Sequence, residues 1–181
     1  KTFFKKDGIL VVLSFILLFR MPEAFLSKVT ELFLIDTPQD GGLGLSPQEF
    51  GLVQGTVGAI GVSLGGLLGG FMVSRNGLKR WLWPMTVAYT LPAVVYVFMS
   101  FEMPSNLMAV NFCVFFEQFG YGFGLTAYML YLIYISRGDY QTSHYSIVSA
   151  LMSLSMMLPG LFAGVLQEAM GYRYFFVFVL I

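Results

Sequence analysis

The sequence predicts an all-α membrane protein, and three observations lead to this fold class. Hydrophobic residues make up 57% of the 181-residue chain and charged residues only 11%, against roughly 25% charged in ordinary soluble domains. The mean hydropathy is +0.76. Apolar runs recur at the length of about 20 residues that an α-helix needs to cross a bilayer. We expect helices because lipid offers the backbone no hydrogen-bond partners and these runs are far longer than barrel strands.

The apolar runs define five membrane spans and one shorter final segment. They cover residues 8–35, 48–73, 80–101, 107–136, 143–170 and 172–181. The final segment, if helical, reaches about halfway across a hydrocarbon core of ~30 Å. We therefore expect residues 1–181 to form a six-helix bundle with a truncated last helix, as a piece of a longer polypeptide.

Basic residues gather in alternate connections, which predicts an orientation. One set of connections holds Lys1, Lys5, Lys6, Arg75, Lys79, Arg80 and Arg137. The other set is mainly acidic, with Asp36, Asp40, Glu49, Glu102 and one basic exception, Arg173. Because basic residues concentrate on the cytoplasmic side, we expect the N-terminus in the cytoplasm and the loop 36–47 outside. Residues 46–49 after this loop resemble a helix start capped by Ser46.

Composition and motifs exclude several function classes. The net charge is zero and no basic run exceeds three residues, so a nucleic-acid partner is not expected. The single cysteine, Cys113, allows no internal disulfide and no metal cluster, and no cofactor is expected. The chain contains no His-Glu-x-x-His, no Gly-x-Ser-x-Gly and no paired aspartates in adjacent spans. An intramembrane enzyme is therefore not expected.

Glycine and proline residues predict how the spans pack and bend. Gly61, Gly65 and Gly69 repeat every four residues, which places them in one smooth stripe that permits close helix contact. Packing inside one bundle is the main interpretation of this stripe, and a dimerisation face is the alternative. Proline loosens a helix. We therefore expect flexing points at Pro22 and, deep in the fifth span, at Pro159-Gly160.

Three charged residues fall near the middle of the bilayer. At ~1.5 Å per residue, Arg20 and Glu23 lie about 17 and 21 Å into the first span, and Glu117 lies about 15 Å into the fourth. A charge at this depth costs at least ~2.5 kcal/mol. Arg20 and Glu23 are three residues apart, share a helix face and can pair, which leaves one carboxylate in excess.

This charge imbalance predicts a coupling site. A buried carboxylate that binds and releases one proton as water access alternates is a simple proton-coupling device. We expect Glu117 or Glu23 to carry the proton, and Arg20 to be its switchable partner or an anchor for an anionic solute group. A static structural salt bridge is the alternative. Neutral hydrogen bonds to a solute can come from Gln118, Tyr121 and Tyr128. Lys28 and Glu31, near the outer interface, are expected to form a snorkelling pair.

The connection between the second and third spans resembles a known loop signature. Gly70-Phe-Met-Val-Ser-Arg-Asn-Gly-Leu-Lys-Arg80 is similar to the cytoplasmic Gly-x-x-x-Asp-Arg-x-Gly-Arg-Arg loop of the major facilitator superfamily. Gly70, Arg75, Gly77 and Lys79 match within this stretch, which Arg80 closes. Ser74 replaces the aspartate and Leu78 a basic residue. Such degraded copies of the signature occur in the second half of the chains of that superfamily, so the resemblance implies the C-terminal six-helix half.

Further segments resemble the AmpG-type muropeptide permeases within this superfamily. They are Arg20-Met-Pro-Glu-Ala-Phe25, residues 115–128 and residues 143–164. The resemblance implies a twelve-helix, proton-driven permease of the bacterial inner membrane that imports peptidoglycan-derived muropeptides. It implies lipid, solute, protons and an N-terminal six-helix half as partners. It also implies that Arg20, Glu23 and Glu117 share one aqueous cavity. Another solute, such as a sugar or acyl-coenzyme A, and a non-transporting receptor or scaffold remain as alternatives.

Overall fold

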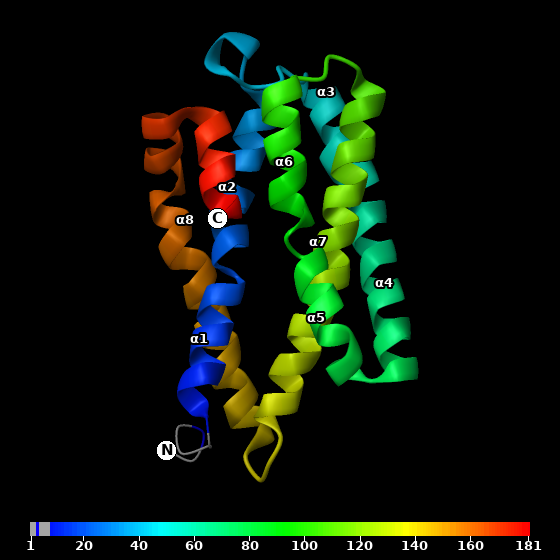
Figure 1. Cartoon of the computed structure of the whole chain (residues 1–181), viewed down its shortest axis with the longest axis vertical. Helices are drawn as coiled ribbons and strands as arrows, with labels where there is room; N and C mark the ends of the chain where they lie inside the picture. Colours follow the sequence, from blue (N-terminus) through cyan, green and yellow to red (C-terminus); the bar gives the residue numbers. More distant parts are fainter. Residues whose placement is uncertain (1–2, 4–7) are drawn as a thin grey trace.

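The computed structural model describes Phe3 and residues 8–181, and helices account for almost all of them. No strand occurs in these residues, so the all-α prediction is confirmed. Five stretches can cross a membrane by length and composition: Ile9–Ile35, Pro47–Asn76, Leu78–Glu102, Leu107–Ser136 and Gln141–Leu180. They run up and down in an elongated bundle (Figure 1). Large apolar side chains point outward from it, such as Trp83 and Leu67, as a surface facing lipid requires.

The first stretch is broken at Arg20 into α1 (Ile9–Phe19) and α2 (Met21–Ile35). Pro22 explains the break, because it has no N–H to donate and its ring clashes with the carbonyl four residues earlier, that of Leu18. The N–H of Arg20 donates to the Leu18 carbonyl, so it does not make the α-helical hydrogen bond to the carbonyl four residues earlier. The break places Arg20 between two helices rather than within one.

The second stretch begins after a loop that contains the short 3₁₀-helix η2 (Pro38–Asp40). It consists of α3 (Pro47–Phe50), the π-helix η3 (Gly51–Gly58) and α4 (Ala59–Asn76). Ser46 Oγ accepts from the N–H of Glu49 at 3.3 Å, and the Glu49 carboxylate accepts from the N–H of Ser46 at 2.9 Å. The predicted helix start at Ser46 is therefore confirmed as a full capping box.

The third stretch is also broken, into α5 (Leu78–Ala88) and α6 (Leu91–Glu102). One continuous span was predicted there, without the effect of Pro92. This proline stands in the first turn of α6, where its ring would clash with the Ala88 carbonyl of a continuous helix. The bundle therefore has a helix break at Arg20 and another at Tyr89-Thr90.

The remaining helices are longer. α7 (Leu107–Ser136) is unbroken and is capped by Asn106, whose side chain accepts from the N–H of Met108 at 2.9 Å. α8 (Gln141–Leu180) contains Pro159 and changes direction at Gly171. The φ of Gly171 is 72°, a conformation that favours glycine. The chain turns back there, so the segment after Gly171 descends beside α2 and α6 (Figure 1).

The glycine stripe lies against α7. A Cβ at Gly65 would stand 2.2 Å from the Phe119 carbonyl oxygen, and one at Gly61 would stand 2.8 Å from the Phe115 oxygen. Real side chains do not approach backbone so closely, so only glycine allows this contact. The interpretation as packing within the bundle is confirmed. A dimerisation face at these positions is wrong, because α7 covers the stripe.

Two apolar cores lie on either side of the mid-span charges. Along α1 and α2, Ile16 belongs to one core and Phe25 to the other. Along α7, Val114 belongs to the core of Phe25, and Tyr128 to that of Ile16. The charged positions 20, 23 and 117 fall between these core residues on both helices.

The basic turns share one end of the bundle. Arg75, Lys79 and Arg80 lie at the α4–α5 turn, Arg137 lies at the α7–α8 turn, and both turns are at the lower end in Figure 1. The loop between α2 and α3 lies at the opposite end. Lys1, Lys5 and Lys6 lie outside the described residues.

Candidate functional site

The candidate site is a polar layer at mid-height of the bundle, between α2 and α7. Arg20 is positioned by the break before α2, Glu23 by the first turn of α2, and Glu117 by the middle of α7. Arg20 and Glu117 are each only 7% exposed, and Glu23 is half-buried. All three face the interior.

Two tyrosines join these charges into one cluster. Tyr121 on α7 lies within electrostatic range of Arg20, Glu23 and Glu117. Tyr89, at the break between α5 and α6, lies within electrostatic range of Arg20 and Glu23, and its ring is 5.7 Å from that of Tyr121. We call these five residues the charged cluster. Tyr89 was not predicted as a site residue. The feature of the sequence that points to it is Pro92, a mid-span proline like Pro22, because it breaks the helix next to Tyr89.

Much of the hydrogen-bonding capacity of the charged cluster is unmet. Arg20 Nε and Nη1, Glu117 Oε2 and the Tyr89 hydroxyl are buried, and none has a hydrogen-bond partner among the described residues. The other Glu117 oxygen accepts from Gln118 Nε2 at 3.3 Å. Buried polar atoms without partners are costly. The cluster can therefore engage a proton or a polar solute group more readily than a saturated network can.

The ion pair expected between Arg20 and Glu23 is not formed within the part of the chain that the structure describes. The two side chains interact electrostatically, but Nε and Nη1 of Arg20 remain without partners. The two side chains take different directions: Glu23 lines one cavity, whereas Arg20 lines a separate groove.

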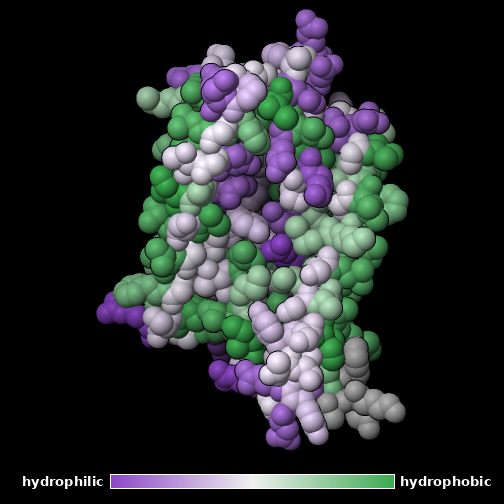
Figure 2. All heavy atoms as spheres, turned by 180° about the vertical axis from the view of Figure 1, so that it is seen from behind, coloured by the Kyte–Doolittle hydropathy of each residue, from purple (hydrophilic) through white to green (hydrophobic). Residues whose placement is uncertain are grey.

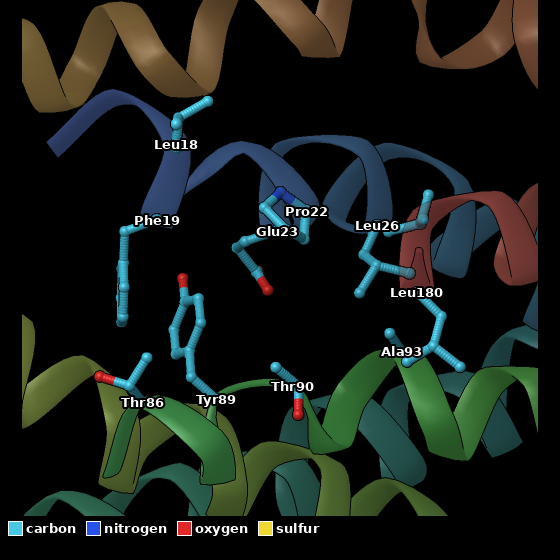
Figure 3. A pocket seen from close by; sticks show the side chains of 11 residues that line it. Leu18, Phe19, Pro22, Glu23, Leu26, Thr86, Tyr89, Thr90, Ala93 and Leu180 are labelled. Carbon is cyan, nitrogen blue, oxygen red and sulfur yellow. The ribbon is translucent and has the colours of Figure 1, made fainter. Parts of the chain in front are cut away.

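Glu23 points into a cavity of about 210 Å³ between the two helix breaks (Figure 3). Tyr89 extends toward the same space from the opposite side. The remaining walls come from both broken stretches and from the end of α8: Leu18, Phe19, Pro22, Leu26, Thr86, Thr90, Ala93, Val179 and Leu180. This cavity is mostly apolar, so the Glu23 carboxylate is its main ionisable group.

Arg20 lines a different hollow, a groove of about 480 Å³ between α2 and α8. Ser27, Lys28, Met152, Ser153, Met156, Met157 and Gly160 line it as well. Lys28 thus lies along this groove, and no ion pair with Glu31 forms in the described residues. The expected snorkelling pair is therefore wrong, because the stem of Lys28 packs against α8, with Cγ 3.7 Å from where a Cβ of residue 160 would stand.

The other residues singled out by the sequence lie as follows. Gln118 is half-buried beside Gly58 of η3. Tyr128 is fully buried, its ring stacks on Phe19 at 4.7 Å, and its hydroxyl donates to the Ile16 carbonyl at 3.1 Å. In this conformation Tyr128 supports the break at Arg20, in contrast to the expected role in lining a solute site.

The loop-signature residues are remote from the charged cluster. Gly70, Arg75, Lys79 and Arg80 lie at or near the α4–α5 turn, where the three basic side chains are exposed. Arg75 stacks over Phe71 of its own helix, 5.1 Å from the ring centroid. Gly77 has a φ of 80°, which the turn requires.

The distribution of polar residues agrees with an internal site. Seen from behind, hydrophilic residues surround a recess in the upper half of the molecule, and apolar residues cover its flanks (Figure 2). In the described part of the chain, no three His, Cys, Asp or Glu side chains gather as metal ligands would.

No protein-family model matches the chain, but curated relatives match it from end to end. It is 27% identical over 178 residues to an anhydromuropeptide permease of Escherichia coli, which covers 98% of this chain and 35% of the relative. It is 26% identical over 181 residues to a putative transporter AmpG 4 of Rickettsia conorii, covering 100% and 42%. It is 22% identical over 175 residues to a putative transporter AmpG 2 of Rickettsia typhi, covering 97% and 41%.

The chain therefore spans about two fifths of the length of these relatives. Together with five stretches that can cross a membrane, the matches support a multi-pass membrane protein. Homologues named AmpG or anhydromuropeptide permease cover the whole chain, and the predicted resemblance to AmpG-type permeases is confirmed.

Proposed function

We propose that this chain is the C-terminal six-helix half of a proton-coupled secondary transporter of the bacterial inner membrane. The relatives that match it are named permeases or transporters, which supports a transport function. The name of the Escherichia coli relative favours anhydromuropeptides or a related solute as cargo. The remaining length of the relatives leaves room for an N-terminal half that completes the pathway. The basic turns would then face the cytoplasm.

The observation that carries the proposal is the buried charged cluster with partnerless polar atoms. Arg20 and Glu117 are each 7% exposed in helices that can cross a membrane, where charge is expensive and is usually kept for a pathway. The cluster also lies where two spans are broken. In secondary transporters, broken helices supply binding groups at mid-membrane depth. A purely structural element would pair its charges directly.

The contacts support a division of roles within the cluster. Glu117 has one oxygen bonded to Gln118 and one without a partner, so it can take up a proton without losing a protein contact. Glu23 is the second candidate proton carrier, since it lines a cavity next to Arg20. Arg20 offers fixed donors to an anionic group of the solute. Gln118 and Tyr121 add neutral hydrogen-bonding groups.

Movement is proposed at the helix interruptions. Rocking of this half against the other would expose the charged cluster to each side in turn. Pro22 breaks the first stretch beside Arg20. Pro159 and Gly160 lie in α8, where Gly160 stands against α2 with its Cβ position 3.6 Å from the Ala24 carbonyl oxygen. Bending at α8 would therefore change the groove that Arg20 lines.

The test is uptake by the full-length protein in proteoliposomes with an imposed proton gradient. Radiolabelled anhydromuropeptide, a simple sugar and an acyl-coenzyme A are offered separately. We expect accumulation of the anhydromuropeptide, and we expect Glu117→Gln or Glu23→Gln to abolish uphill accumulation while solute exchange survives. Glu168→Gln, at an exposed position of α8, serves as the control. If both cluster variants accumulate solute normally, the coupling assignment is wrong; if no solute accumulates, a receptor or scaffold role is favoured.

A further inference from the structure

We propose that the groove between α2 and α8 is a two-cation binding site for a peptide-like solute with two separated carboxylates. In this site Arg20 binds the first carboxylate and Lys28 binds the second. The inference rests on the proposed transport function and deepens it, because it names the chemical feature of the solute that this half recognises.

Arg20 meets the requirements of a buried anion receptor. Its side chain lines the groove, is 7% exposed, and leaves Nε and Nη1 without partners among the described residues. Glu23 faces a different cavity, so the nearest carboxylate does not occupy these donors. These two nitrogens lie on different edges of the guanidinium, so each can donate a charge-assisted hydrogen bond to a carboxylate oxygen.

Lys28 provides a second cation further along the same groove. It follows Arg20 by eight residues, which corresponds to about 12 Å along α2. The Lys28 stem lies on α8 beside Gly160: a Cβ at residue 160 would stand at van der Waals distance, 3.7 Å from Lys28 Cγ and 3.8 Å from Cε. Glu31 is the nearest acidic residue on α2, and the described residues contain no ion pair between the two. The ammonium is therefore available to a solute in the groove.

The remaining lining can accommodate a short peptide. The Ser27 hydroxyl donates to the Ala24 carbonyl at 3.5 Å, and that of Ser153 donates to the Ser149 carbonyl at 3.1 Å. Each serine oxygen can still accept a hydrogen bond from an amide N–H. Met152, Met156 and Met157 supply flexible apolar surface that adapts to varied side chains. The groove thus offers a cation at two positions along its length, amide acceptors and an adaptable wall.

The test measures binding of two probes to the full-length protein in detergent or nanodiscs. One probe is an anhydromuropeptide with a free peptide C-terminal carboxylate, and the other is the same molecule with that carboxylate amidated. We expect the wild type to bind the free acid about tenfold more tightly, as loss of one charge-assisted hydrogen bond implies. Lys28→Gln should remove this preference by weakening the acid alone, and Lys28→Arg should retain it.

Two outcomes overturn the inference. One is a wild type that binds acid and amide equally, and the other is a Lys28→Gln variant that keeps the wild-type preference. A second measurement does not depend on the Gln variant: Lys28→Cys, in a Cys113→Ala background, should be protected from a thiol reagent by the free acid and far less by the amide. If the protein binds the free acid in a Lys28-dependent way but transports no solute, the proposed function is contradicted and the proposed binding site still stands.

Discussion

At the residue scale, Tyr128 shows how one hydroxyl compensates for a break inside a membrane-spanning stretch. The N–H of Arg20 bonds to Leu18 and not to Ile16, so the Ile16 carbonyl loses its helical partner. The Tyr128 hydroxyl, fully buried, donates to that carbonyl at 3.1 Å. Lipid offers no replacement for such a bond. The polar tip of Tyr128 thus holds α1 in the position that leaves Arg20 in the interior.

Removal of this hydroxyl tests which role Tyr128 has. We expect Tyr128→Phe to lower the free energy of unfolding by about 1 kcal/mol, since the Ile16 carbonyl is left unsatisfied. Thermal unfolding in detergent measures this change, and solute affinity should stay as in the wild type. Unchanged stability together with weaker solute binding would instead return Tyr128 to the solute-lining group.

At the element scale, the contact between α4 and α7 depends on the absence of side chains. We expect Gly65→Ala to destabilise the protein by about 1–3 kcal/mol, as for overpacked interiors, because its Cβ would stand 2.2 Å from the Phe119 carbonyl oxygen. Gly70→Ala is the matched control on the same helix, with nothing within 4 Å of its Cβ. Thermal unfolding of both variants measures the difference. Equal stability of the two variants would contradict the packing described.

The break at Pro22 is a second element with a direct consequence. We expect Pro22→Ala to let the first stretch continue as one helix, which redirects the Arg20 side chain so that it can pair with Glu23, three residues further along the same helix. Stability should then rise and uphill uptake should fall, because Arg20 becomes occupied. Pro84→Ala is the control, since Pro84 lies inside α5 without breaking it. Higher stability with unimpaired uptake would show that the open Arg20 is not required.

At the scale of the whole molecule, the sequence was sufficient for the fold class and for the burial of the charges. Apolar runs indicate spans, and Arg20, Glu23 and Glu117 stand out because charge in a span is rare. The break at Tyr89-Thr90 was not predicted, because Pro22 was treated as a helix breaker and Pro92 was not. The predicted pair of Lys28 with Glu31 was wrong, because the depth of a residue along its helix does not tell which neighbouring helix its side chain faces. The partner of Tyr128 depends on a carbonyl 112 residues away, which no local pattern predicts.

The recess on one face also carries a prediction about the intact protein. Because hydrophilic residues around it remain uncovered in this chain (Figure 2), we expect these residues expressed alone to insert into membranes without transporting solute. Co-expression with the remaining part of the full-length protein should restore uptake. Uptake by the separate piece at the full-length rate would contradict the proposal that two halves enclose the pathway.

The central claim is that the charged cluster couples proton and solute movement, and solute-driven proton flux tests it most directly. The full-length protein is reconstituted in liposomes that contain a pH-sensitive dye, and a gradient of anhydromuropeptide is imposed without a proton gradient. We predict proton entry with the solute in the wild type. In Glu117→Gln the solute should equilibrate without proton movement, or, if Glu23 is the carrier, the same result should appear in Glu23→Gln. Proton entry at the wild-type ratio in both variants would contradict the claim.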